Sequence, residues 1–328
     1  MDILSELFRD SGLRRRLVNR RGLVPGRTLA FPCDRSLGFH VVLEGVVYLH
    51  APSLPTPIRL AAGDIAVMGR GCTHWLSTSA HMSGMPVDNV DVDVTPARVA
   101  ANDGSTPTLV SGAYQLWNTP VHPFFSELPE WFVLRTDESP RFEPLSLAVA
   151  MLTNESTHGA GASELLGRGT VVHGLLDVLF TYLLRTIVAR DDAVGAGWMH
   201  AVGDTAVRKA VQAIHAESAR DWTLDMLASE VGVSRSVLAL RFRASMRDTP
   251  LSYLRTVRMQ RAMRLLTESD ATLERVATDV GYRDAFSFSK AFKKLVGVSP
   301  GEFRKRDAAE RHLAWRFRAE EAVGQSTR

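Results

Sequence analysis

The chain has 328 residues, of which 45% are hydrophobic and 23% are charged, and its formal net charge is +3. This composition is typical of a globular protein large enough for two domains, and no apolar run of about 18 residues or more indicates a membrane span. The first residues lack the basic-then-apolar order of a signal peptide, and two cysteines are too few for a disulfide framework. We therefore expect a cytoplasmic protein.

The net charge hides an asymmetry between the two halves of the chain. Residues 201–328 hold 23 Lys and Arg against 16 Asp and Glu, a net of +7, whereas residues 1–200 have a net of −4. A basic half is typical of a surface that faces a polyanion such as nucleic acid. The mildly acidic half then has a different task.

Short strands separated by turns are predicted over about 23–135. The stretches "LGFHVVLEGVVYLHA" and "IRLAAGDIAVMG" are rich in aliphatic residues, and the second reads as a strand pair with its turn at 61–64. Residues 79–110 are polar and rich in Gly, Pro and Asp, which predicts a long loop with room for one strand. Strands at this spacing indicate an all-β sandwich or barrel.

Helices are predicted from about residue 143 onward. The stretch "EPLSLAVAMLTNEST" reads as a short helix, and residues 171–189 read as a longer one. The longer helix has apolar residues near helical spacing at Leu175, Leu176, Leu179, Leu183, Leu184 and Ile187. Because it is apolar on more than one face, we expect it to be buried against the barrel or a partner subunit. The stretch "DDAVGAG" then predicts a linker.

Two similar helical units follow, about 50 residues apart. In "TLDMLASEVGVSRSVLALRFRASM", Thr223 caps a helix, Gly232 turns the chain and Ser234 caps a second helix. In "TLERVATDVGYRDAFSFSKAFKKLVG", Thr272 and Asp284 are the caps, with Phe288, Phe292 and Leu295 expected inside. A helix, a glycine turn and a second helix with a small, polar and basic outer face is the helix-turn-helix pattern of DNA-binding proteins.

The helix between the two units reads "TPLSYLRTVRMQRAMRLLTES". Its inward positions are predicted at Leu251, Leu254, Val257, Met259, Ala262 and Leu265. Its outward positions are predicted at Arg255, Arg258, Arg261 and Arg264, in contact with solvent or with phosphates. An internal repeat of this kind is more informative than a single motif match.

These stretches resemble the DNA-binding domain of the AraC/XylS family of bacterial transcription regulators, over about 204–306. The resemblance implies two recognition helices in successive major grooves. On their base-facing positions it places Arg235, Ser236, Ala239, Leu240, Asp284, Ala285, Phe286, Ser287 and Lys290; the outer faces add Arg243, Lys293 and Lys294. Leu240 and Phe286 are apolar where the family often has polar or small residues. We therefore expect some readout through thymine methyl groups.

The N-terminal half resembles the cupin-like sensor domain that precedes such DNA-binding domains. His40 and Glu44 match the end of the first cupin motif, and Gly63, Asp64 and His74 match the second. Cupin enzymes usually hold a metal with about three His and one carboxylate, so this motif is depleted. We predict an effector pocket formed by His40, Glu44, Cys72, His74 and Cys33. Either His40 and His74 bind a metal ion as a cofactor, or they only line the pocket.

A redox signal is a further alternative. Cys33 and Cys72 would approach each other if the strands that carry His40 and His74 are neighbours, as they are in a cupin. Related sensor domains often have a Cys in the segment that here reads "LVSGAY", where this chain has Ser111. This departure weakens a transferred redox mechanism.

The sequence thus predicts an α+β multidomain protein. A cupin-like β-barrel spans 1–142, a helical linker and dimerisation segment 143–198, an all-α domain with two helix-turn-helix units 199–306, and a tail 307–328. The predicted function is sequence-specific regulation of transcription, as an activator, by a homodimer. Its expected partners are double-stranded promoter or operator DNA, RNA polymerase and an effector whose identity the sequence does not give. No association with a membrane is expected.

The chain lacks a G-x-S-x-G, a P-loop and an H-E-x-x-H motif, and we name no catalytic residue. The main alternative is a metal-dependent cupin enzyme fused to a DNA-binding domain. A further one is a ligand-independent activator whose barrel only dimerises.

Overall fold

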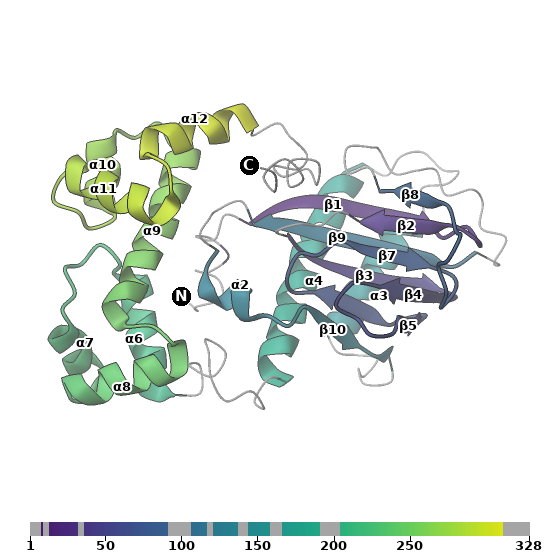
Figure 1. Ribbon diagram of the computed structural model, residues 1–328, viewed down its shortest axis with the longest axis horizontal. Helices are drawn as coiled ribbons and strands as arrows, with labels where there is room; N and C mark the ends of the chain where they lie inside the picture. The colour runs from purple at the N-terminus through teal and green to yellow at the C-terminus, as the bar shows by residue number, and fades with distance from the viewer. Residues whose placement is uncertain are drawn as a thin grey trace. The chain divides into compact units, whose positions relative to one another are not determined.

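The computed structural model describes residues 8, 13–31, 36–90, 106–116, 121–136, 144–157, 166–190 and 204–310 (Figure 1). Their packing divides into one unit built mainly of strands and one built of helices. Residues 116 and 121–128 fall inside the predicted barrel range of 1–142, yet they pack with the helical unit, whose other described residues are 8, 13–14, 190 and 204–310. The remaining described residues between 15 and 189 form the strand unit.

The strand unit contains two five-stranded sheets (Figure 1). The first has the order β1 (Leu13–Gly22), β9 (Thr108–Leu116), β3 (Ser36–Glu44), β6 (Ile65–Met68) and β10 (Trp131–Leu134). The second has the order β5 (Ile58–Ala61), β4 (Val46–His50), β7 (His74–Ser77), β2 (Thr28–Phe31) and β8 (Val87–Asn89). Strands β2 and β8 are parallel, and β3 is antiparallel to both β6 and β9. The predicted cupin-like β-barrel is confirmed.

Inward-facing side chains of both sheets share one apolar core. It consists of Leu23, Phe31, Val42, Val47, Leu49, Leu60, Ala66, Met68, Leu76, Val90, Leu109 and Ala113. Strands β6 and β9 are buried along their whole length, as expected where both faces of a sheet are covered. The outer cover of β9 is helix α4 (Arg168–Arg190): the Tyr114 ring stacks on Phe180 with centroids 4.1 Å apart, and its hydroxyl donates to Asp177 at 3.0 Å.

The expected turn at 61–64 is present, but the strands on either side of it do not pair with each other. Strand β5 pairs with β4 in one sheet and β6 pairs with β3 in the other, so this turn carries the chain between the sheets. Strand β8 and the start of β9 lie within 79–110, where a loop with one strand was expected.

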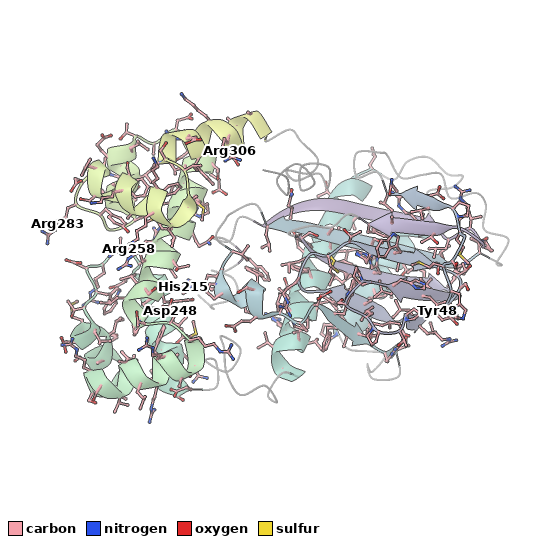
Figure 2. All side chains as sticks on the ribbon, viewed as in Figure 1. Tyr48, His215, Asp248, Arg258, Arg283 and Arg306 are labelled. Carbon is pink, nitrogen blue, oxygen red and sulfur yellow. The ribbon has the colours of Figure 1, made fainter. Side chains whose placement is uncertain are left out.

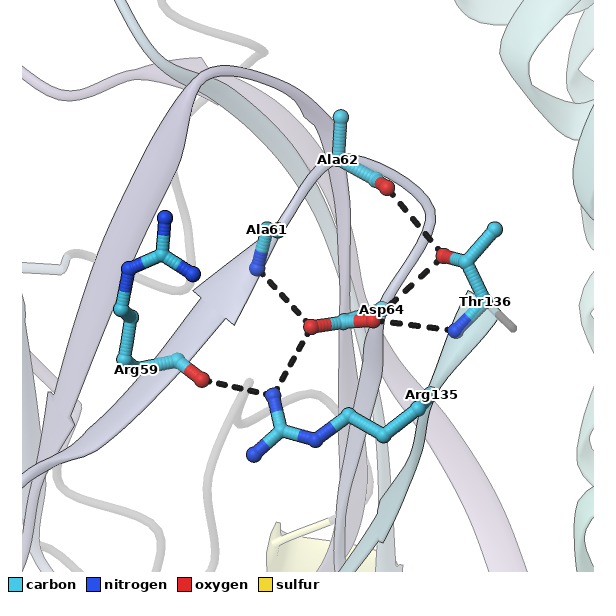
Figure 3. Close-up of polar contacts among 6 residues, drawn as sticks. All are labelled: Arg59, Ala61, Ala62, Asp64, Arg135 and Thr136. Carbon is cyan, nitrogen blue, oxygen red and sulfur yellow. Dashed lines mark hydrogen bonds and ion pairs between the residues drawn. The ribbon is translucent and has the colours of Figure 1, made fainter. Parts of the chain in front are cut away.

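A buried carboxylate fixes the turn between the sheets (Figure 3). Asp64 accepts hydrogen bonds from the backbone N–H groups of Ala61 at 2.9 Å and Thr136 at 3.0 Å, and from the Arg135 guanidinium at 2.8 Å. Burial raises the pKa of Asp64, but these bonds and the Arg135 charge outweigh it and leave that pKa below its ordinary value. Gly63 has φ +88°, and an added Cβ would lie 2.3 Å from the Thr136 hydroxyl. The Gly63–Asp64 pair is therefore a structural clamp, which joins the turn between β5 and β6 to the residues that follow β10.

Helices α3 (Pro144–Thr157) and α4 agree with the two helices predicted for the segment after the barrel. By length and composition, Thr170–Ala189 could cross a membrane, but a buried core helix passes the same test. Leu179, Leu183 and Leu184 are buried within the strand unit, and Phe180 packs on β9. We therefore interpret α4 as a core helix.

The helical unit includes the short α2 (Pro123–Glu127). Seven further helices lie between 204 and 310. They are α6 (Thr205–Ala216), α7 (Leu224–Val231), α8 (Arg235–Met246), α9 (Pro250–Glu268), α10 (Leu273–Asp279), α11 (Ala285–Val296) and α12 (Pro300–Glu310). The predicted caps are all observed: Thr223, Ser234, Thr272 and Asp284 each accept a hydrogen bond from the first turn of their helix.

Several side chains of the helical unit are placed differently from the predictions. Arg261 and Arg264, expected outside, are half-buried, and Arg261 donates to the Ser218 hydroxyl at 3.2 Å. Leu251 and Leu295, expected inside, are 39% and 37% exposed. Arg258, expected outside, is partly buried in α9 (Figure 2): its Nε donates to the Ser218 carbonyl and its guanidinium to the Arg220 carbonyl, both at 2.8 Å. This arginine therefore holds the loop after α6, where the Arg220 carbonyl also accepts from the Trp222 backbone N–H at 2.8 Å.

A double helix-turn-helix surface and a buried histidine pair

The first recognition helix is α8. Leu238, Phe242 and Ser245 are buried and fix the helix to the unit, which turns the opposite face outward. On that face Leu240 is 73% exposed, and Arg243 is also exposed. The remaining predicted contacts lie at its start: Arg235 pairs with Asp225 at 3.5 Å, and Ser236 shares a hydrogen bond with the cap Ser234. Ala239 is half-buried.

The second recognition helix, α11, repeats this arrangement. Phe288 and Phe292 are fully buried, and Phe286 on the outer face is 80% exposed. Lys290, Lys293 and Lys294 are exposed along the helix, with Ala285 half-buried at its start. A large apolar side chain with basic neighbours is costly to leave in water, and such a face is typical of a surface that meets a partner.

Two of the residues predicted to contact bases also stabilise α11 itself. The Asp284 carboxylate accepts from the Ser287 backbone N–H at 2.7 Å and from the Ser287 hydroxyl at 2.9 Å. These hydrogen bonds lower the pKa of Asp284 below its ordinary value. Arg283, which directly precedes this cap, is exposed and projects outward (Figure 2). Arg283 is not among the residues predicted from the sequence, although its basic charge beside a recognition helix is a visible signal.

In the strand unit, His40 and His74 face each other across the core. His40 lies on β3 of one sheet and His74 on β7 of the other, with their Nε2 atoms 2.8 Å apart. The two strands do not pair with each other, because β3 pairs with β6 and β9 whereas β7 pairs with β2 and β4. The two rings nevertheless meet, because both point inward.

The hydrogen bonds around the pair assign its protons. His74 Nδ1 lies 3.0 Å from the Cys72 carbonyl, which accepts only, so the His74 proton is on Nδ1. His74 Nε2 is then the acceptor and His40 Nε2 the donor. His40 Nδ1 accepts from the Ser111 hydroxyl at 2.7 Å. One directed chain, from Ser111 through His40 and His74 to the Cys72 carbonyl, satisfies both neutral rings.

Burial keeps both imidazoles neutral. It lowers the pKa of His40 well below its ordinary value, with a smaller contribution from His74, and it lowers the pKa of His74 to about 4. Phe31 stacks on His74 with centroids 5.1 Å apart, and the Trp131 ring meets His74 edge-on at 5.0 Å. The two imidazoles are thus polar groups surrounded by aromatic rings within the apolar core.

The other predicted pocket residues are placed differently. Glu44 is exposed beyond an irregularity in β3 and accepts a hydrogen bond from Thr108. Cys72 packs against the apolar core, and Cys33 lies outside the described residues. Among the described residues, no group of three or more His, Cys, Asp or Glu could hold a metal ion. The donor set described therefore does not fit a cupin metal centre.

The sequence did not predict the hydrogen bonds that four further residues make with buried partners. Ser111 was noted for the cysteine it replaces, and the hydrogen bond that it donates to His40 was not expected. Tyr253 is fully buried in α9, where its hydroxyl lies 2.8 Å from His215 of α6 and 3.1 Å from His122 before α2. His122 and His215 gave no local signal, because their partner is distant in sequence.

Two recognition-type helices on one helical unit, joined to a cupin-like barrel, define a DNA-binding regulator with a separate N-terminal domain. Comparisons with known proteins agree. A cupin family matches residues 2–189, and a helix-turn-helix domain family matches residues 227–306. The chain belongs to the AraC-like transcription regulators, as the resemblance in the sequence predicted.

Three relatives illustrate this relationship. A putative AraC-like transcription regulator of Streptomyces lividans is 30% identical over 277 residues, which is 84% of this chain and 88% of that protein. The transcriptional regulator AlkR of Acinetobacter baylyi is 25% identical over 316 residues, 93% of this chain and 99% of that protein. A solved structure of the AdpA DNA-binding domain with a target DNA is 28% identical, covers 34% of this chain and 98% of that chain, and has a TM-score of 0.32.

Proposed function

We propose that this transcription regulator reads its DNA target through the outer faces of α8 and α11. The observation that carries this proposal is the matched pair of exposed faces, each with one large apolar residue, Leu240 or Phe286, beside basic side chains. The apolar residues would contact thymine methyl groups, and the exposed lysines and arginines would contact phosphates.

The salt dependence of DNA binding tests the phosphate contacts. For the full chain on a fixed duplex, log K falls linearly with log salt, by about 0.9 for each phosphate neutralised. Lys293→Gln should reduce this slope by about that amount if Lys293 contacts a phosphate. Lys305→Gln makes the same charge change on α12 and should leave the slope unchanged. Equal slopes for both variants and the wild type would contradict the proposed surface.

The sensing site of the barrel is proposed at the His40–His74 pair. Two neutral, hydrogen-bonded imidazoles within an apolar core can exchange partners with a ligand hydroxyl, and the rings of Phe31 and Trp131 can contact its apolar body. Because both imidazoles are neutral and are surrounded by aromatic rings, we propose a small uncharged ligand.

A panel of probes tests this site on the full chain. Phenol should raise the melting temperature of the wild type, and His74→Phe should abolish the shift; benzoate, which adds a charge, should have no effect. Zn²⁺ and hydrogen peroxide, added in the same assay, test the metal and redox alternatives. A shift with Zn²⁺ or a response to peroxide, with none for phenol, would replace the proposed ligand class.

The rest of the proposed function concerns assembly and location. We propose a cytoplasmic, non-enzymatic homodimer that acts with RNA polymerase. Support for the dimer comes from exposed apolar residues on the helices after the barrel, Leu147 and Met151 on α3 and Val171 and Val178 on α4. Sedimentation of the purified chain tests the dimer: Met151→Glu should shift it toward monomer, and a wild type that sediments as a monomer would contradict it.

A further inference from the structure

The segment 121–128 lies between two barrel strands in the sequence but belongs to the helical unit by its packing. Phe124 and Phe125 of α2 are 0% and 1% exposed. A five-residue helix cannot bury two phenylalanines by itself, so residues outside α2 cover them. The segment is therefore a docked part of the DNA-binding unit.

Three buried side chains form a directed hydrogen-bond chain at this docking site. His122 Nδ1 accepts from the Phe124 backbone N–H at 3.2 Å, which places the proton of the neutral ring on Nε2. His122 Nε2 therefore donates to the Tyr253 hydroxyl, 3.1 Å away, and Tyr253 donates to His215 Nε2, 2.8 Å away. One tyrosine hydroxyl thus joins the segment to both α9 and α6.

The same tyrosine touches the first recognition helix. Its ring meets Phe242 edge-on with centroids 5.8 Å apart, and Phe242 is fully buried on the core side of α8. A change in how Tyr253 is held would therefore reach the helix that presents Leu240 and Arg243. Packed aromatic contacts of this kind transmit small displacements, because the core cannot deform continuously.

The strands on both sides of the segment touch the histidine pair of the barrel. Ser111 of β9 donates to His40, and Trp131 of β10 meets the ring of His74. Strand β9 ends at Leu116, and β10 begins at Trp131, three residues after Leu128. The segment is therefore joined in sequence, on both sides, to strands that contact the histidine pair.

We propose that residues 121–128 are a latch through which the state of the His40–His74 pair controls the seating of α8. When the segment is docked, His122 and the two phenylalanines hold Tyr253 against Phe242. When the segment is released, the packing of Tyr253 on the buried side of α8 changes. This inference rests on the proposed sensing site. A signal that shifts the latch from 1:99 to 99:1 must favour one state about 10⁴-fold over the other.

Hydrogen exchange of the full chain, followed by mass spectrometry, tests the docking. Tyr253→Phe removes the hydroxyl and keeps the ring, so amides of 121–128 should exchange about tenfold faster while those of β3 and β6 are unchanged. Tyr282→Phe makes the same change at a half-buried tyrosine that packs on Phe288 in the other helix-turn-helix unit. It should leave 121–128 unchanged. Wild-type exchange in Tyr253→Phe, or equal acceleration by both variants, would overturn the latch.

Ser111→Ala tests the connection to the barrel in the same measurement. It should change the exchange of 121–128 several-fold, and Ser111→Thr, which keeps the hydroxyl, should restore it. If Tyr253→Phe frees the segment but Ser111→Ala does not affect it, the segment docks without control by the barrel and the latch is refuted. Failure of the phenol experiment together with a positive Ser111→Ala result would refute the sensing ligand and leave the latch intact.

Discussion

Removal of the Asp64 carboxylate should cost the barrel about 2–4 kcal/mol. In Asp64→Ala, two backbone N–H groups, those of Ala61 and Thr136, lose a charged acceptor, and bonds of this kind contribute about 1.5–3 kcal/mol each before relaxation. The ion pair with Arg135 adds little, about 1 kcal/mol or less, because that side chain is 38% exposed. Water can reach part of the freed site, which sets the upper limit.

Urea unfolding followed by far-UV circular dichroism measures this loss. Asp88→Ala is the matched control in the same unit, since Asp88 pairs with Arg27 at the surface, with exposed fractions of 41% and 45%. The control should lose less than about 1 kcal/mol. If Asp64→Ala costs no more than Asp88→Ala, the clamp between β5, β6 and the end of β10 does not stabilise the barrel and the reasoning fails.

Three further predictions follow from the same structure. Because the pKa of folded His74 is about 4, below that of an unfolded histidine, the unfolded chain binds more protons at this residue as the pH falls. The His74 contribution to barrel stability should decrease by about 3 kcal/mol from pH 6.5 to 4, and His74→Gln should weaken the pH dependence in urea titrations while the contribution of His40 remains. Arg247 has a left-handed φ of 53° at the end of α8, so Arg247→Gly should raise the free energy of unfolding by about 0.5–1 kcal/mol, whereas a loss would show that its side chain stabilises the unit. Elemental analysis of His40→Ala and the wild type should give equal metal contents, and stoichiometric metal lost in the variant would favour the metal-dependent enzyme.

The helical unit could be predicted from the sequence almost residue by residue. Its signals are local: caps at Thr223, Ser234, Thr272 and Asp284, a glycine at each turn, and apolar residues at helical spacing. Periodicity determines which face is buried when a helix has one neighbour. It fails at helix ends, where Leu251 and Leu295 follow the apolar period but have no core to enter.

The barrel site was only partly predictable. The resemblance to the cupin motifs correctly predicted that His40 and His74 lie in one site. It did not predict that their strands belong to opposite sheets, because strand pairing depends on crossovers such as the turn at Asp64. Glu44 leaves the site because β3 is irregular near its end, which no local pattern revealed. The docking of His122 on Tyr253 joins residues 131 positions apart, and a sequence without aligned relatives carries no signal for such a contact.

Selection of bound duplexes from a random DNA pool by the full chain tests the central claim most directly. The wild type should select a target with two separate conserved parts, one for each recognition helix. Leu240→Ala, on α8, should relax the preference in one part, and Phe286→Ala, on α11, should relax it in the other. Readout through these two faces would be contradicted if the wild type selected no preferred sequence. It would also be contradicted if both variants selected the same target as the wild type.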